Sequence, residues 1–269
     1  MIDLLESLVG SPVAVEELKH KPGRRRTLRA RGSRRTAIVK LYESDRASVV
    51  AARLAALAAG PPEPQVPRVL HVDPARRMLV LSELHGEPLR TSIVAGDLAA
   101  CARVGRALAT WHAAWRSMHS GAFRPQTFAE EKRILLAQAA AAPPTIAAAV
   151  RAGLAALEGA WPCTTVVHRD LYEEQILLGD RVGLIDLDDA ALGPPELDLG
   201  NLLAHIELLA LRAGREFGLA SEALLEGYMT SLDDALLDRC RRLAVLRLAC
   251  IHRLPRLLDR AQLREEVSA

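Results

Sequence analysis

The chain has 269 residues, half of them hydrophobic and a quarter charged, and its formal net charge is +2. This profile predicts a folded protein with one large domain or two lobes and excludes a disordered chain. The near balance of 35 basic and 33 acidic side chains gives no reason to expect nucleic acid as a general partner.

Three further observations concern the cellular compartment. The four cysteines show no CxxC spacing, so we expect reduced thiols rather than disulfides or zinc ligands. The first residues, MIDLLESLVGSPVAVEE, carry acids where an export signal needs a basic stretch. The most membrane-like run, residues 135–150, is mostly alanine, contains Pro143 and Pro144, and is too weak to span a bilayer. We therefore expect a cytoplasmic protein without a membrane partner.

The first third of the chain is predicted to form a small sheet. Short alternating or β-branched runs predict strands at residues 13–20, 27–31, 36–42, 68–73 and 77–83. Turn residues at Pro22-Gly23 and Gly32-Ser33 separate the first three strands. A helix over 45–59 is inserted before the fourth strand and stops at Gly60. We expect a five-stranded antiparallel sheet with one helix.

After Gly86 the pattern changes to long helices, and short strand-like pieces return only around 164–186. The predicted helices cover residues 97–118, 127–141, 145–158, 195–213, 221–230 and 233–264. Pro255 is expected to break the last helix. The fold class is therefore α+β, with a sheet-rich lobe over 1–84 and a larger, mainly helical lobe over 85–269.

Residues 168–186, HRDLYEEQILLGDRVGLID, place two acids and an amide beside short apolar runs. Asp170 and Gln175 bound one loop, and Asp186 follows the apolar run 182–185. Because the runs 176–178 and 182–185 are joined by a short turn, we expect them to pair antiparallel and to bring Asp186 beside that loop. Phosphoryl transfer needs a carboxylate for the attacking hydroxyl and oxygen ligands for magnesium. We interpret His168 as a packed loop residue rather than a proton carrier.

These motifs resemble a known group of enzymes. HRDLYEEQ is similar to the catalytic loop of the protein-kinase-like superfamily, and LIDLDDAALGPPELDLGNLLAH is similar to the metal loop of its aminoglycoside phosphotransferase and choline kinase branch. Weaker similarities, VPRVLHVD, LVLSELHGEPL, VGRALATWHAAW and LLEGYM, extend over most of the chain. The resemblance implies a two-lobe kinase-like fold and transfer of the γ-phosphate of ATP, or of GTP, to a hydroxyl of a small molecule.

The resemblance also implies individual roles. Asp170 is the catalytic base, and Gln175 and Asp186 are the Mg²⁺ ligands. Glu83 and Leu84 lie in the hinge that meets the nucleotide base. Asp198 is a structural acid that braces the catalytic loop.

Lys40, in AIVKLY, resembles the strand lysine that contacts the α- and β-phosphates of the nucleotide. The family often pairs this lysine with a glutamate on the following helix, but residues 46–59 contain no acid. Its partner is therefore open between Glu43, Asp45 and none. Gln175 is a second departure, because the family usually has the shorter asparagine there. Both departures leave a catalytically weak pseudokinase, a nucleotide or ligand sensor, as the alternative function.

The segment 21–37 is rich in arginine. It contains Arg24, Arg25, Arg26, Arg29, Arg31, Arg34 and Arg35. Two interpretations are equally weighted: a cationic cover over the triphosphate, or a solvated hairpin face. A nucleic-acid patch is a weaker hypothesis, because no aromatic residues are interleaved for base stacking.

The acceptor is expected to be small. Asp186 and Asp198 are too close in sequence for a segment that would dock an extended peptide. Nearby acids would favour a cationic acceptor such as an amino sugar or amino alcohol if they line the pocket, and otherwise they are loop or capping acids. These acids are Glu173, Glu174, Asp188, Asp189 and Glu207. A sugar, nucleoside or natural-product hydroxyl stays open, and we expect a monomer or weak homodimer.

Overall fold

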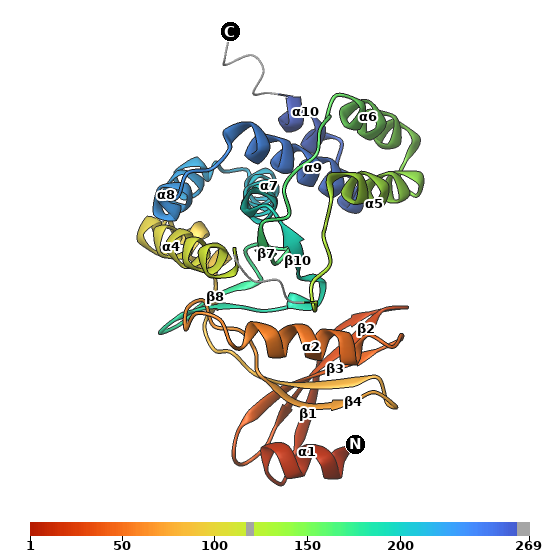
Figure 1. Ribbon diagram of the computed structural model, residues 1–269, viewed down its shortest axis with the longest axis vertical. Coiled ribbons are helices and arrows are strands. Elements are labelled where there is room, and N and C mark those ends of the chain that lie inside the picture. The colour runs from red at the N-terminus through yellow and green to blue at the C-terminus, as the bar shows by residue number, and fades with distance from the viewer. Residues whose placement is uncertain (117–120, 263–269) are drawn as a thin grey trace.

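The computed structural model describes residues 1–116 and 121–262, which form two lobes (Figure 1). The N-terminal lobe holds a sheet and the C-terminal lobe is mainly helical, so the predicted α+β class is confirmed. Within the described ranges, no helix is both long and apolar enough to cross a bilayer.

The predicted five-stranded sheet is present in the described part of the N-lobe. Its strand order is β1-β2-β3-β5-β4, and every neighbouring pair is antiparallel. The strands are β1 (Ala14–Lys21), β2 (Arg25–Arg31), β3 (Thr36–Tyr42), β4 (Val69–Asp73) and β5 (Met78–Ser82). Lys40 stands opposite Thr27 of β2 and Leu79 of β5, so it lies in the middle of the sheet.

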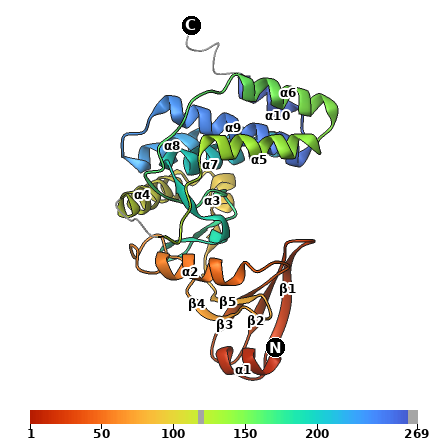
Figure 2. The same cartoon turned by 45° about the vertical axis from the view of Figure 1, so that its right-hand side comes forward.

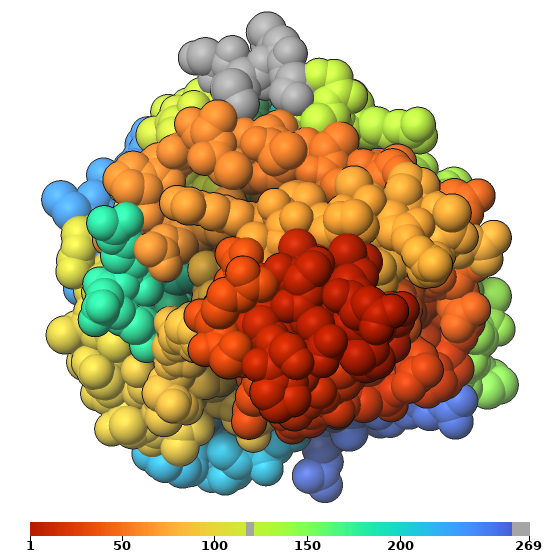
Figure 3. Space-filling model, turned by 90° about the horizontal axis from the view of Figure 1, so that it is seen from below, coloured from red at the N-terminus to blue at the C-terminus, as the bar shows by residue number. Residues whose placement is uncertain are grey.

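Each face of this sheet is covered by one helix, because alternate residues of a strand point to opposite faces. Val39 and Val80 are buried with Leu5 of α1 (Ile2–Val9). Leu79 and Leu81 are buried with α2 (Ala47–Leu57), which lies between the sheet and the helical lobe (Figures 1 and 2). Seen from the N-lobe end, α1 occupies the centre of the exposed face (Figure 3).

The helix α1 was not predicted from the sequence. It has eight residues, and a helix this short is marginal without tertiary contacts. Arg35 donates from Nε to the carbonyl of Leu8 at 2.8 Å, and Arg34 donates to the carbonyl of Ser7. These arginines satisfy carbonyls at the negative end of the helix dipole, so residues more than 25 positions away stabilise it.

The C-lobe follows a link that contains β6 (Glu87–Pro88) and α3 (Leu89–Ala95), neither of which was predicted. Its other helices agree with the predicted ones to within a few residues, and the ends of the predictions at 117–118 and 263–264 lie outside the described residues. They are α4 (Leu98–Trp115), α5 (Phe128–Ala140), α6 (Pro144–Ala155), α7 (Pro195–Ala213), α8 (Gly218–Tyr228), α9 (Asp234–His252) and α10 (Arg256–Gln262). The predicted break falls before Pro255, at Arg253 with φ of 52°.

Close helix crossings build the C-lobe core. A Cβ atom at Gly105 of α4 would lie 2.1 Å from the carbonyl oxygen of Leu224 on α8, and one at Gly227 would lie 2.1 Å from that of Ala102. Gly200 of α7 meets the backbone of α9 in the same way, with Arg241 N at 2.6 Å. Glycine at these positions lets the helices pack backbone to backbone, which sets the position of α7.

Short strands connect this core to the lobe boundary. The predicted pairing of residues 176–178 with 182–185 is confirmed as the antiparallel pair β8 (Ile176–Leu178) and β9 (Val182–Leu184). In addition, β7 (Thr165–Val167) pairs with β10 (Ala191–Gly193), which was not predicted. The two pairings bring the loop 168–175 and the segment after β9 to the same place, facing the N-lobe.

Candidate active site

A buried carboxylate on α7 holds the loop that follows β7. Asp198, in the first turn of α7, accepts hydrogen bonds from the backbone N–H groups of His168 and Arg169, both at 2.7 Å. It also lies 3.2 Å from Nε2 of His112. Arg169 has a φ of 71°, an uncommon conformation for a residue with a side chain, and these bonds hold it there. Asp198 therefore positions the neighbouring Asp170.

The same loop is attached at two further points. The Nε2 atom of His168 lies 2.8 Å from the carbonyl oxygen of Ile185, and the His168 side chain is fully buried. Asn201, one turn further along α7, donates to the carbonyl of Leu171 at 2.6 Å. The interpretation of His168 as a packed residue agrees with this geometry.

Side chains of the N-lobe converge on Asp186 and Asp188 of the C-lobe. Lys40 places Nζ 2.9 Å from Oδ1 of Asp186 and 2.5 Å from Oδ1 of Asp188. The guanidinium of Arg25 donates to both acids, and the hydroxyl of Tyr42 donates to Asp188 at 3.0 Å. Arg25 stands opposite Tyr42 in the sheet register, and Lys40 is two positions from Tyr42. All three side chains therefore leave the same face of the sheet.

Opposite charges favour the ionised forms of Asp186 and Arg25 in this cluster. Burial alone would raise the pKa of Asp186, but Lys40 and Arg25 outweigh it and hold that pKa well below its usual range. Burial opposes the charge on Arg25, yet Asp188 and Asp186 raise its pKa above the ordinary value. Tyr42 stays a neutral donor, because burial and the adjacent Asp188 raise its pKa. The loss of one partner would leave a buried charge uncompensated.

The partner of Lys40 is therefore different from the expected ones. Neither Glu43 nor Asp45 contacts it in the described structure, and Asp45 pairs with Arg77 at 2.9 Å. Its partners Asp186 and Asp188 lie 146 and 148 residues away in the sequence. Lys40 therefore needs no acidic partner on α2, because the segment after β9 supplies two acids.

Gln175 and Asp186 offer the oxygen ligands that Mg²⁺ prefers. Because β8 begins directly after Gln175, the β8–β9 pairing brings its amide beside Asp186, with Nε2 3.3 Å from Oδ2. A rotation of the amide would exchange its nitrogen and oxygen, so the carbonyl can face the same place. A carboxylate and an amide oxygen, completed by phosphate oxygens, fit a hard cation. The glutamine side chain is long enough to reach Asp186 in this loop.

Asp170 lies at the edge of the cluster. It lines a cavity together with Lys21, Arg25 and Asp186. Its side chain is 44% exposed, and Oδ1 lies 3.8 Å from Nη2 of Arg247 on α9. The carboxylate is therefore accessible to a hydroxyl group that enters from the C-lobe side.

Glu83 and Leu84 lie elsewhere along the lobe boundary. They line a separate cavity of about 580 Å³ with Gly86 and Gly179, a size suited to a small ligand. Glu83 also accepts a hydrogen bond from Nε of Arg29 at 2.7 Å. The structure thus groups Lys40, Asp170, Gln175 and Asp186 in one place and sets the two link residues at another.

The arginines of residues 21–37 have different partners. Arg25 reaches the cluster, whereas Arg26 and Arg31 pair with acids of β1. Arg34 and Arg35 donate to the end of α1. The solvated-hairpin interpretation therefore fits most of these arginines, and Arg25 is the one that the acids of the C-lobe engage.

Most of the acids considered as ligands of the acceptor form ion pairs with basic side chains. Glu174, Asp189 and Glu207 each pair with an arginine, at 3.1, 2.6 and 2.8 Å respectively. Asp188 belongs to the cluster around Lys40. These four acids therefore have cationic partners within the protein, which agrees with the alternative that they are loop acids.

Glu173 differs from the other acids of this group, because it is buried. Burial raises the pKa of its carboxyl to about 7. Burial also lowers the pKa of the neighbouring His205, 3.8 Å away, to about 3, and the charge of Arg247 acts in the same direction. Both shifts favour the neutral form, so this pair is a neutral contact beneath the loop, with His205 stacked on Tyr172.

The lobes and the site together define a protein with the protein-kinase-like fold. The chain is similar to choline kinase from Cryptosporidium parvum, with a TM-score of 0.68 and 9% identity over 98% of this chain and 94% of that one. It is also similar to macrolide 2'-phosphotransferase from Brachybacterium faecium, with a TM-score of 0.60 and 20% identity over 97% and 94%. At these identities the similarity establishes the fold.

The chain belongs to the phosphotransferase enzyme family, whose model matches residues 22–233. Homoserine kinase from Methylorubrum populi is 41% identical over 99 residues, which cover 32% of this chain and 29% of that protein. The match to this curated relative thus spans less than a third of its length. The family expected from the motifs around Asp170 and Asp186 is confirmed.

Proposed function

We propose that this protein transfers the γ-phosphoryl group of ATP to a hydroxyl of a small molecule. The observation that carries the proposal is the shared cavity of Asp170 and Asp186, with the buried Lys40 and the half-buried Arg25 beside it. Family membership and fold support the same reaction class. A protein that moves a phosphoryl group needs these elements: a base, metal ligands and cations for the phosphates.

Asp170 would accept the proton of the acceptor hydroxyl while the hydroxyl oxygen bonds to the γ-phosphorus. The bond from that phosphorus to the bridging oxygen breaks, and ADP leaves. Lys40 and Arg25 would move part of their interaction from Asp186 and Asp188 to phosphate oxygens. Two cations shared by two acids suit this exchange, because each guanidinium or ammonium group has several donors.

Asp186 and Gln175 would hold Mg²⁺, which supplies positive charge next to the transferred group when it is bound. The cavity at Glu83 and Leu84 would take the nucleotide base, ATP or GTP. We further propose that the lobes divide into 1–84 and 85–269. Free cysteines in the described structure support a cytoplasmic protein, and a monomer or weak homodimer remains our expectation.

Phosphoryl transfer to a panel of acceptors tests the proposal. The panel takes L-homoserine, choline, an aminoglycoside and a macrolide from the names of similar proteins. We expect Mg-ATP to raise the melting temperature of the wild type, and transfer to at least one acceptor, or slow ATP hydrolysis, that Asp170→Asn abolishes while nucleotide binding survives. Asp259→Asn, an exposed carboxylate on α10, is the matched control. Absence of any nucleotide-dependent stabilisation would refute the proposal.

A pseudokinase gives a different result in the same assays. It would bind nucleotide but show neither transfer nor hydrolysis, and Gln175→Asn would bring no gain. The intact Asp170 and Asp186, and the contact between Gln175 and Asp186, favour the catalytic function.

A further inference from the structure

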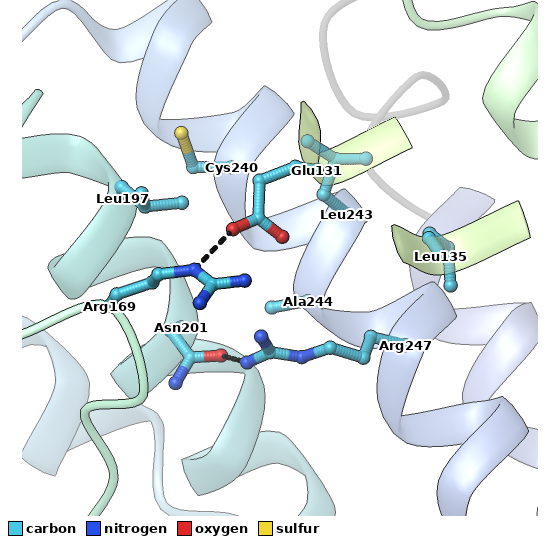
Figure 4. A pocket seen from close by; sticks show the side chains of 9 residues that line it. All are labelled: Glu131, Leu135, Arg169, Leu197, Asn201, Cys240, Leu243, Ala244 and Arg247. Carbon is cyan, nitrogen blue, oxygen red and sulfur yellow. Dashed lines mark hydrogen bonds and ion pairs between the residues drawn. The ribbon is translucent and has the colours of Figure 1, made fainter. Parts of the chain in front are cut away.

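A small cavity next to Asp170 contains two arginines that the phosphoryl-transfer site does not use. It lies between α5, α7 and α9, and Arg169, directly before Asp170, points into it (Figure 4). Arg247 enters from α9, and its guanidinium points toward that of Arg169. The remaining lining is largely apolar. It consists of Glu131, Leu135, Leu197, Asn201, Cys240, Leu243 and Ala244.

These arginines keep hydrogen-bond donors available. Arg169 bonds Glu131 through Nε at 3.0 Å, and Arg247 donates through Nη2 to Asn201. In the described part of the chain, no hydrogen bond is found for the two Nη groups of Arg169 or for Nη1 of Arg247. Each guanidinium carries five N–H donors in a planar fork that matches a carboxylate. The two guanidinium groups point toward each other and keep unused N–H donors, so together they attract an anion.

The charges around this cavity argue against a cationic group in it. Glu131 already accepts from Arg169 and from Gln126 at 2.9 Å, and Asp170 lies 3.8 Å from Arg247. A cation in this cavity would therefore meet two guanidinium groups at close range, and the two nearby acids already interact with these arginines. The cavity volume of about 20 Å³ admits a small polar group but no sugar ring.

We propose that this cavity, the Arg169–Arg247 subsite, binds a carboxylate of the phosphoryl acceptor. The acceptor is then a small hydroxy acid or hydroxy amino acid, whose carboxylate contacts the two arginines while its hydroxyl reaches Asp170. This inference rests on the proposed function for the role of the hydroxyl, but anion binding by the subsite can be measured without it.

Three four-carbon alcohols with matched chains test the inference. They are 4-hydroxybutyrate, 1,4-butanediol and 4-amino-1-butanol, which are anionic, neutral and cationic at the end away from the hydroxyl. We expect 4-hydroxybutyrate to bind in calorimetry without nucleotide, and its kcat/KM to exceed those of the other two by about 10- to 100-fold, the range of charge-assisted hydrogen bonds. Equal values for the three, or a preference for the amine, would overturn the subsite.

Variants separate acceptor binding from support of Asp170. Arg247→Met keeps the length of the side chain and removes its charge. We expect it to raise KM for 4-hydroxybutyrate by at least tenfold and to leave the KM for 1,4-butanediol within threefold, with partial recovery in Arg247→Lys. An equal fall in kcat on both acceptors would show that Arg247 supports Asp170 rather than binding the acceptor, and would refute the proposal. Arg169→Met provides the same test if Arg247→Met does not fold, and Arg151→Met, exposed on α6, is the control.

Binding and turnover distinguish the two proposals. If 4-hydroxybutyrate binds and Arg247→Met abolishes that binding while no acceptor is phosphorylated, the subsite stands and the proposed function fails. If transfer occurs without preference for the acid, the function stands and the subsite fails. Inorganic phosphate tests for a free-anion site: binding of phosphate that Arg247→Met removes, with no binding of 4-hydroxybutyrate, would also overturn the assignment to an acceptor.

Discussion

The support that Asp198 gives to the loop 168–175 leads to the sharpest quantitative prediction. Its carboxylate is buried and accepts two backbone N–H groups at 2.7 Å besides its contact with His112. Asp198→Ala leaves the N–H groups of His168 and Arg169 buried without an acceptor. Charge-assisted bonds stabilise by about 1.5–3 kcal/mol each, and a broken buried pair costs about 3–5 kcal/mol, so we expect a loss of about 4 kcal/mol.

Urea unfolding followed by circular dichroism measures this loss. With a slope of about 3 kcal/mol per molar, as for a protein at the large end of the usual range, the midpoint should fall by roughly 1.3 M. Asp198→Asn keeps the shape and one acceptor oxygen, so about half of that loss is expected. Activity should fall by about a hundredfold or more in Asp198→Ala, because Asp170 loses its position by an ångström or so.

The matched control is Asp233, which caps α9 by accepting from the N–H of Leu236 at 3.0 Å. Asp233→Ala should cost about 1 kcal/mol and leave activity unchanged. If Asp198→Ala is no more destabilising than Asp233→Ala, or if it retains wild-type activity, the argument for Asp198 as the support of this loop is wrong.

Further predictions concern the charged cluster and the half-buried His205. Arg25→Ala should raise KM for Mg-ATP by about tenfold in steady-state assays, whereas Arg26→Ala, on the same hairpin, should not; equal effects would contradict a specific role. Gln175→Ala should raise the Mg²⁺ concentration for half-maximal activity by about tenfold, and an unchanged value would remove it from the metal site. Burial lowers the folded pKa of His205 to about 3, so its contribution to stability is complete above its unfolded pKa of about 6.5 and is lost as the pH falls toward 3. Between pH 7 and 5 the melting temperature of His205→Gln should therefore fall less steeply than that of the wild type, and parallel slopes would contradict this.

Local spacing in the sequence was sufficient to predict that two acids and an amide lie close together. Asp170, Gln175 and Asp186 lie within 17 residues that contain one hairpin. Because a short turn forces its two strands to pair antiparallel, the residues at the open end must meet. The sheet and the long helices could also be predicted from local sequence. Apolar residues recur every second residue in a half-buried strand and about every 3.6 residues in an amphipathic helix.

Contacts between distant segments were decided by the tertiary structure. In sequence Arg25 resembles the other arginines of its hairpin. Strand parity and sheet register place it with Lys40 and Tyr42 on the face that meets Asp188, 163 residues later. The meeting of Arg247 with Arg169 and Asn201 likewise depends on how α7 and α9 cross. A sequence shows which charges a protein carries, but the packing of its elements determines which of them are left without a partner and thus available for a ligand.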